Sequence, residues 1–218
     1  MAGTEAVVRA LLDVAGRTYA REAGIRPGDT PQPLYRTLVL ACLLSARIQA
    51  SIAVATSRAL YDAGLRDPRR MADATWQHRV DALGQGGYRR YDERTATQLG
   101  DGARLLLDSW GGDLRRVRGE ADGDVSEVKK RLRRVPGLGP TGVDIFLREV
   151  QDVWPEYAPY LDAKALQGAE RLGLPSEVSA LARAAGDTGT GVLAAALVRA
   201  ALDSSVAEEC LRRAKGAG

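Results

Sequence analysis

The chain has little of several residue types, and each shortage excludes a class of protein. It holds two cysteines, Cys42 and Cys210, in 218 residues, which allows neither a disulfide framework nor a cysteine-rich metal site. The longest strongly apolar run, residues 37–46, is about half of what a membrane span needs. We therefore expect a cytoplasmic, nucleoid-associated protein with no membrane partner.

Aromatic residues and lysines are also scarce. Aromatic side chains make up 5% of the chain, so the core is expected to be aliphatic and built from closely packed helices. Of the 31 basic residues only four are lysines, which leaves few candidates for an amine nucleophile. The net charge of +3 permits an anionic partner without requiring one.

Apolar residues recur at helical spacing along almost the whole chain, with breaks at Gly, Pro, Asp and Thr. The pattern predicts an all-α protein with no strand. Residues 25–33 are expected to form a linker, and residues 84–90 and 111–124 surface loops. The predicted helices cover residues 4–22, 33–46, 49–63, 75–83, 91–110, 124–134, 142–152, 162–172, 176–185, 190–203 and 205–214.

The strongest local pattern is a helical hairpin at residues 125–150. Apolar residues at positions 125, 128, 132 and 135 predict an amphipathic helix that carries five basic residues on its other faces. Pro136 ends this helix, Gly137 and Gly139 permit a tight turn, and Pro140 suits the first turn of a second helix. Exposed backbone N–H groups at such a turn bind phosphate, which predicts a DNA-backbone anchor. The alternative is an ordinary corner whose glycines only permit the turn.

The same glycines match a second pattern. Gly137, Gly139 and Gly142 fit the dinucleotide-binding motif G-x-G-x-x-G, which suggests a nucleotide-dependent oxidoreductase as an alternative function. That motif follows a strand in a parallel sheet, whereas here an amphipathic helix precedes it. The alternative predicts measurable strand content.

Three stretches in the same order and spacing resemble the helix-hairpin-helix DNA glycosylases of the endonuclease III-like group. LLSAR at 43–47 resembles the LLSAQ segment of that family, and VPGLG at 135–139 resembles its LPGVG hairpin. Leu161-Asp162, with the stretch 165–174 that ends in RLGL, resembles its VDTHV-to-RLGL region. The resemblance implies a DNA base-excision repair glycosylase that acts as a monomer on double-stranded DNA containing a damaged or mismatched base.

The resemblance also implies two helical subdomains with a DNA-binding cleft between them. Residues 31–150 would form a six-helix barrel that includes the hairpin at about 125–150, and residues 1–30 with 151–218 would form a second helical bundle. Apolar residues are placed to hold this bundle together: Leu193, Leu197, Val198 and Leu202.

In this family an aspartate stabilises positive charge on the sugar as the base leaves, and Asp162 stands at that position. An aspartate here also suits the N-cap of a helix beginning at Ala163, and the two roles are compatible. The family's strand-cutting members have a lysine where this chain has Thr141, so the resemblance implies a monofunctional enzyme without lyase activity. Lys164 is kept as a minor candidate for a nucleophile.

Two alternatives remain open within the resemblance. A bifunctional glycosylase and lyase would use Lys164, whereas a non-catalytic helix-hairpin-helix protein would keep only DNA binding. The iron–sulfur cluster of many relatives needs four cysteines near the C-terminus, where this chain has Cys210 alone, so no such cluster is expected. A monovalent cation at the hairpin is left open.

The resemblance assigns the DNA contacts to three regions. Arg47 replaces the glutamine that fills the gap left by an extruded base, or binds a phosphate. Tyr88 either wedges into the opened duplex or packs against Tyr91, and Arg89 lies beside it. The expected contacts at the hairpin are Lys130, Arg134, Gly137, Leu138, Gly139, Thr141 and Gly142.

Overall fold

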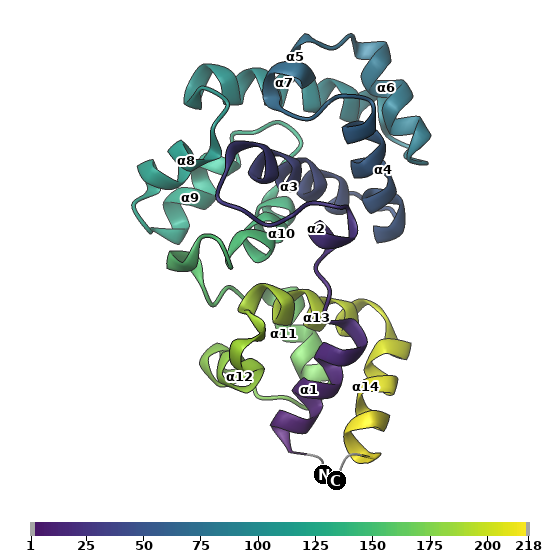
Figure 1. Cartoon of the computed structure of the whole chain (residues 1–218), viewed down its shortest axis with the longest axis vertical. Helices are drawn as coiled ribbons and strands as arrows, with labels where there is room; N and C mark the ends of the chain where they lie inside the picture. Colours follow the sequence, from purple (N-terminus) through teal and green to yellow (C-terminus); the bar gives the residue numbers. More distant parts are fainter. Residues whose placement is uncertain (1–2, 217–218) are drawn as a thin grey trace. The chain divides into compact units, whose positions relative to one another are not determined.

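Helices account for all the regular structure in the described part of the chain (Figure 1). The computed structural model describes residues 3–216, which form α-helices and two short 3-10 helices and contain no strand. The all-α prediction is confirmed. The oxidoreductase alternative is excluded, because its dinucleotide-binding fold requires a parallel sheet.

Two compact units divide the described residues. Unit 1 comprises residues 3–19 and 147–216, and unit 2 comprises residues 20–146. In unit 1 the helices are α1 (Thr4–Ala15), α11 (Ala163–Arg171), α12 (Val178–Ala185), α13 (Thr190–Leu202) and α14 (Ser204–Gly216), with 3-10 turns η1 (Pro155–Tyr157) and η2 (Gly186–Thr188).

The helices of unit 2 come before and include the hairpin. They are α2 (Tyr19–Glu22), α3 (Pro31–Leu44), α4 (Ala50–Asp62), α5 (Pro68–Asp73), α6 (Trp76–Gln85), α7 (Asp92–Trp110), α8 (Leu114–Ala121) and α9 (Val125–Leu132). Helix α10 (Pro140–Val150) begins in unit 2, and its last residues, from Leu147, belong to unit 1.

Helix α13 forms the centre of unit 1. Most of its residues are buried, and it packs against α1, α11, α12 and α14. Gly168 of α11 faces it so closely that a Cβ at this position would collide with the carbonyl oxygen of Leu197. Leu193 and Leu197 are fully buried as predicted, but Leu202 is 61% exposed. Leu202 is the last residue of α13, where the helix leaves the core.

A buried arginine ties three helices of unit 2 together. Arg79 of α6 is 4% exposed and donates hydrogen bonds to the carbonyl oxygens of Met71, Ala74 and Ala96. Burial lowers the pKa of this guanidinium. Its neutral acceptors fix the approach of α6 to α7, and α7 carries several residues of the candidate site.

The two compact units divide the chain after residues 19 and 146, whereas the predicted domain boundaries lie after residues 30 and 150. Residues 20–30 belong to unit 2 because the expected linker is packed rather than free. Ile25 is 2% exposed, and Arg36 of α3 donates to the carbonyl oxygen of Ala23 at 3.3 Å. At the second boundary, Arg148 belongs with unit 1 because its side chain pairs with Asp162.

Two further predictions of local structure were wrong. The predicted helix 4–22 is interrupted after Ala15, so that α1 and α2 are separate. The predicted loop 111–124 contains α8, whose Leu114 and Val117 are 1% and 0% exposed. Charged residues between these apolar positions obscured their helical spacing.

Within residues 3–216 no single helix is both long and apolar enough for a membrane span. Only α13 and α14 taken together, with a bend of 114° between them, meet that test of length and composition.

Candidate functional site

The hairpin turn between α9 and α10 is fixed by its neighbours in unit 2. Gly137 adopts φ +84°, which disfavours other residues, and a Cβ there would lie 3.2 Å from Cβ of Gln98. Leu138 is 2% exposed, and its N–H donates to the carbonyl oxygen of Val135 at 3.0 Å. A Cβ on Gly142 would lie 2.9 Å from Cδ1 of Leu138. Leu138 and Gly142 therefore hold the turn in place by packing.

The start of α10 leaves backbone open. Gly139 and Thr141 are exposed, and a Cβ on Gly139 would meet no atom within 4 Å. Among the described residues, no backbone carbonyl accepts a hydrogen bond from the N–H of Gly139 or Thr141. Such groups at a helix N-terminus are available to an anion.

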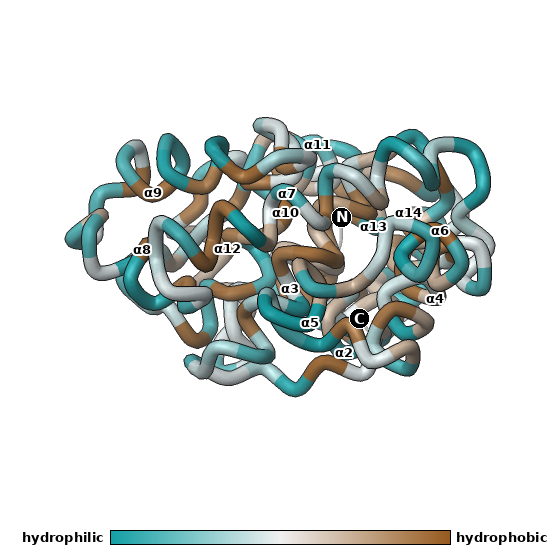
Figure 2. Tube along the Cα trace, turned by 90° about the horizontal axis from the view of Figure 1, so that it is seen from above, coloured by the Kyte–Doolittle hydropathy of each residue, from teal (hydrophilic) through white to brown (hydrophobic). Residues whose placement is uncertain are grey.

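Helix α9 carries mixed hydropathy, with hydrophilic and hydrophobic segments alternating along its turns (Figure 2). Val128 and Leu132 are fully buried, as the spacing predicted. Several basic side chains already have partners. Lys129 pairs with Asp144 of α10 at 3.1 Å, and Arg131 pairs with Glu127 and Glu120. Hydrogen bonds from Trp110 and then Arg131 lower the pKa of Glu120, and hydrogen bonds from Arg131 and then Lys130 lower that of Glu127.

The remaining cations of this region face solvent. The Lys130 side chain is 76% exposed, although its Nζ lies 3.4 Å from Glu127. Arg134 stacks over the ring of Trp110 at 4.8 Å and donates to Ser109 Oγ at 3.2 Å. The Arg133 side chain is exposed and has no hydrogen-bond or ion-pair partner among residues 3–216. An exposed, basic surface therefore lies directly before the turn.

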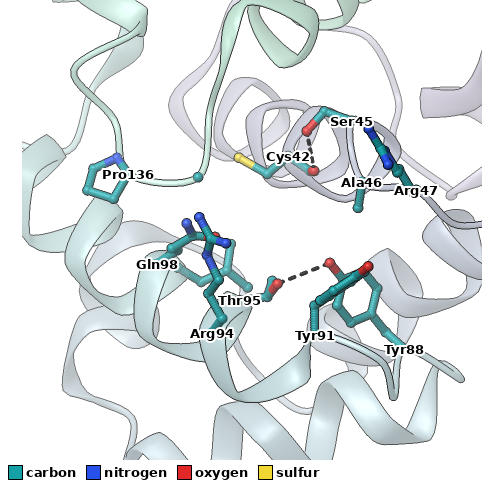
Figure 3. A pocket seen from close by; sticks show the side chains of 12 residues that line it. Cys42, Ser45, Ala46, Arg47, Tyr88, Tyr91, Arg94, Thr95, Gln98 and Pro136 are labelled. Atoms are coloured by element: carbon teal, nitrogen blue, oxygen red, sulfur yellow. Dashed lines mark hydrogen bonds between the residues drawn. The ribbon is translucent and has the colours of Figure 1, made fainter.

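A cavity of about 410 Å³ adjoins the same turn within unit 2 (Figure 3). The end of α3, the segment after α6, the first half of α7 and the turn supply its walls. It is lined by Cys42, Ser45, Ala46, Arg47, Tyr88, Tyr91, Arg94, Thr95, Gln98, Leu99, Pro136 and Gly137. Two of these described residues are arginines and none is acidic, so the cavity is cationic.

The arginines of this cavity are uncommitted. Arg47 and Arg94 are exposed, and neither side chain makes a hydrogen bond or ion pair within the described chain. Arg89, just outside the lining, is also exposed and without a partner among residues 3–216. The sequence analysis named Arg47 as an expected DNA contact, and the structure places it in the cavity lining. Arg94 was missed, since it lies in a helix where many exposed arginines look alike.

Tyr88, for which the sequence left a wedging and a packing role open, is buried. Tyr88 is 3% exposed, and its hydroxyl shares a hydrogen bond of 3.0 Å with Thr95 Oγ1. It therefore forms part of the cavity wall and cannot enter a duplex without leaving the core. The exposed aromatic residue is Tyr91, at 38%. The loop glycines decide this arrangement, because Gly87 adopts φ +88° and turns the chain inward at Tyr88.

Cys42 contributes a thiol to the cavity lining. Burial raises the pKa of the Cys42 thiol to about 12, so it stays protonated at neutral pH. Its carbonyl oxygen accepts a hydrogen bond of 2.7 Å from Ser45 Oγ.

In unit 1 the carboxylate of Asp162 is fixed by two different partners. Asp162 is the N-cap of α11, and its Oδ1 accepts a hydrogen bond of 3.0 Å from the N–H of Ala165. Its Oδ2 lies 2.6 Å from Nη1 of Arg148. The two side chains are 11% and 7% exposed respectively. The predicted cap is thus confirmed, and a buried ion pair is added that the sequence did not suggest.

A second side chain of the same region holds the segment before Asp162. Gln151 is fully buried, and its amide oxygen accepts from the N–H of Tyr160 at 2.7 Å. Its Nε2 donates to the carbonyl oxygens of Tyr160 and Arg148 at 3.0 and 3.1 Å. Residues 160–162 are therefore hydrogen-bonded to the end of α10.

Lys164 points away from this pair. Its side chain is exposed, and its Nζ donates to Gln167 Oε1 at 2.7 Å. The divergence from Asp162 follows from their spacing of two residues, about 200° around a helix. The described residues contain no group of three or more His, Cys, Asp or Glu side chains that could hold a metal ion.

Comparison with known proteins gives one structural similarity. No family profile matches the chain, and characterised proteins give no significant sequence match. Among solved structures, a trapped covalent intermediate of endonuclease III with DNA, an estranged-adenine complex, is 16% identical with a TM-score of 0.47. The similarity covers 74% of this chain and 71% of that one. Similarity at this level does not assign a function.

Proposed function

We propose that this protein is a monofunctional DNA glycosylase that hydrolyses the N-glycosidic bond of a damaged or mismatched base. The observation that carries the proposal is the continuity of two anion-attracting features in unit 2. The turn that exposes the N–H groups of Gly139 and Thr141 also supplies Pro136 and Gly137 to the cationic cavity. A phosphodiester backbone offers anions at regular intervals, which suits such a surface.

The cavity suits an unstacked nucleotide better than a plain anion. Arg47 and Arg94 offer two cations without competing carboxylates, and Tyr91 offers an exposed aromatic ring. Aromatic and guanidinium groups stack on bases that have left a duplex. This combination favours DNA that carries a locally opened site over undamaged duplex.

Asp162 is the proposed catalytic carboxylate. Cleavage of the glycosidic bond builds positive charge on the sugar, and a fixed carboxylate in a shielded position stabilises that charge. Water completes the reaction, since Thr141 offers no amine where the related strand-cutting enzymes have a lysine. The exposed Lys164, bonded to Gln167, is a poor substitute.

The test is base release from a panel of end-labelled duplexes. These carry uracil, G·T mismatches, or alkylated, deaminated or oxidised bases, and each is analysed with and without hot alkali. Strand breaks that need alkali, and that disappear in Asp162→Asn, are the expected result. Asparagine keeps the helix cap and removes the negative charge, and with it the ion pair to Arg148.

Two other outcomes distinguish the remaining candidates. Breaks without alkali, lost in Lys164→Gln, would indicate a lyase that uses Lys164. Duplex binding without base release would indicate a non-catalytic DNA-binding protein. The second candidate is favoured by one observation: both oxygens of Asp162 already have partners inside unit 1.

A further inference from the structure

We infer that Arg148 and Gln151 are positioning residues for Asp162, an inference that rests on the proposed function. Arg148 lies in the last turn of α10 and Gln151 directly follows its last residue, and both are less than a tenth exposed. Arg148 holds the carboxylate itself, and Gln151 holds the backbone of Tyr160, two residues earlier.

The contacts leave the carboxylate little freedom. The N–H of Ala165 and the guanidinium of Arg148 bind different oxygens, so rotation of the carboxylate breaks at least one of the two bonds. The cap alone would fix one oxygen and leave the other to solvent. Arg148 therefore sets the orientation in which Asp162 meets a sugar.

Gln151 fixes the backbone before Asp162 and does not touch the carboxylate itself. Its amide pairs with both the N–H and the C=O of Tyr160, as a neighbouring strand would do. Its third hydrogen bond, to the carbonyl oxygen of Arg148, locks the amide against the helix end. The segment that leads into α11 is thereby held at a constant distance from the residue that orients the carboxylate.

A buried arginine would add nothing if the role of Asp162 were only to cap α11. Capping aspartates elsewhere in the chain have no buried cation: Asp124 at α9 accepts two backbone N–H groups, and Asp113 at α8 pairs with Arg115, whose side chain is 45% exposed. Burying a guanidinium is costly unless its partner is fixed. Positional control of the second oxygen explains why this helix start carries the extra pair.

The experiment measures single-turnover base release, duplex affinity and thermal stability on the full chain. It compares Arg148→Met, Arg148→Lys and Gln151→Met, with Arg171→Met as the matched control. Arg171 is an arginine of α11 that bonds the carbonyl oxygen of Ala200, away from residues 160–162. The duplex is whichever substrate the panel identifies.

We expect Arg148→Met to slow base release about 100-fold, because small misplacements of reacting groups cost that much. Arg148→Lys keeps the charge and should recover to within about tenfold of the unmodified protein. Gln151→Met keeps the ion pair and should slow release about tenfold. Duplex affinity should stay within about twofold throughout, and Arg171→Met should match the unmodified protein.

Unchanged rates in Arg148→Met and Gln151→Met would overturn the inference. So would rates that fall only in step with affinity or with the folded fraction, which a purely structural role predicts. Amide hydrogen exchange at Tyr160 and Ala165 gives a readout that does not depend on catalysis, because these N–H groups donate to Gln151 and Asp162.

Amide hydrogen exchange separates a failure of the positioning inference from a failure of the proposed glycosylase function. If the unmodified protein releases no base from any duplex, the proposed glycosylase function fails. Exchange then decides the positioning inference alone. Faster exchange at Tyr160 in Gln151→Met and at Ala165 in Arg148→Met supports it, and unchanged exchange at both overturns it.

Discussion

The carboxylate region of unit 1 and the arginine-lined cavity of unit 2 treat their charged groups in opposite ways. The Asp162 side chain is 11% exposed and bonded at both oxygens, whereas the side chains of Arg47 and Arg94 are exposed and unpaired among residues 3–216. A group that acts on one bond benefits from a fixed orientation. Groups that hold a polyanion benefit from being free to meet it. Under the proposed function, the first region would supply a carboxylate of fixed orientation and the second a surface that is free to bind an anion.

The largest effect is expected from breaking the buried pair. Asp162→Ala removes the cap and leaves Arg148 buried without its carboxylate, which should lower the free energy of unfolding by about 3–5 kcal/mol. Asp162→Asn keeps a cap acceptor and should lose less. Urea denaturation followed by circular dichroism measures both. Equal losses below about 1 kcal/mol would mean that the pair contributes little to unit 1.

The two glycines of the hairpin give a matched comparison within unit 2. Gly137→Ala forces a side chain into a left-handed conformation and should cost about 1–2 kcal/mol of stability. Gly139→Ala meets open space and should be neutral within about 0.5 kcal/mol. Thermal unfolding of the two variants tests this difference. Similar losses in both would show that the turn is held otherwise than described.

The side chains of Arg47 and Arg94 should contribute to the salt dependence of duplex binding. Arg47→Ala and Arg94→Ala should each weaken duplex binding and reduce the slope of log K against log salt by about one. Arg115→Ala is the control, since Arg115 already pairs with Asp113 at 2.6 Å. Fluorescence anisotropy at several salt concentrations measures the slope. An equal change in the control would remove the distinction between paired and unpaired arginines.

The smallest expected effect concerns the two cysteines, Cys42 and Cys210, which should hardly react with a thiol reagent in the native protein. Cys42 lines the cavity, but burial raises its pKa to about 12, and burial also raises the pKa of Cys210. Both thiols therefore remain protonated at pH 8, and iodoacetamide should label the native protein very slowly. Labelling should become rapid in guanidinium chloride. Fast native labelling, located at Cys42 by mass spectrometry, would contradict the raised pKa of its thiol.

Helix periodicity predicted most of the fold, and the hairpin best of all, because apolar spacing and the Pro136–Gly139 turn agree there. Helix α8 was not predicted, because arginines separate its buried residues. Tyr88 and Tyr91 could not be told apart by pattern, since the backbone conformation of Gly87 determines which ring turns inward. The Arg148 contact was also beyond sequence reasoning, because only the folded unit brings positions 148 and 162 within hydrogen-bonding distance.

The hydrogen bonds around Asp162 also have an evolutionary consequence. Arg148, Gln151 and Asp162 form a spaced signature, R-x-x-Q with an aspartate eleven positions after the glutamine. Because the aspartate compensates the buried arginine, related sequences should gain or lose the two together, and a lineage that abandons one should soon replace the other. This coupled substitution offers a fingerprint by which distant relatives can be recognised independently of the glycine-rich turn.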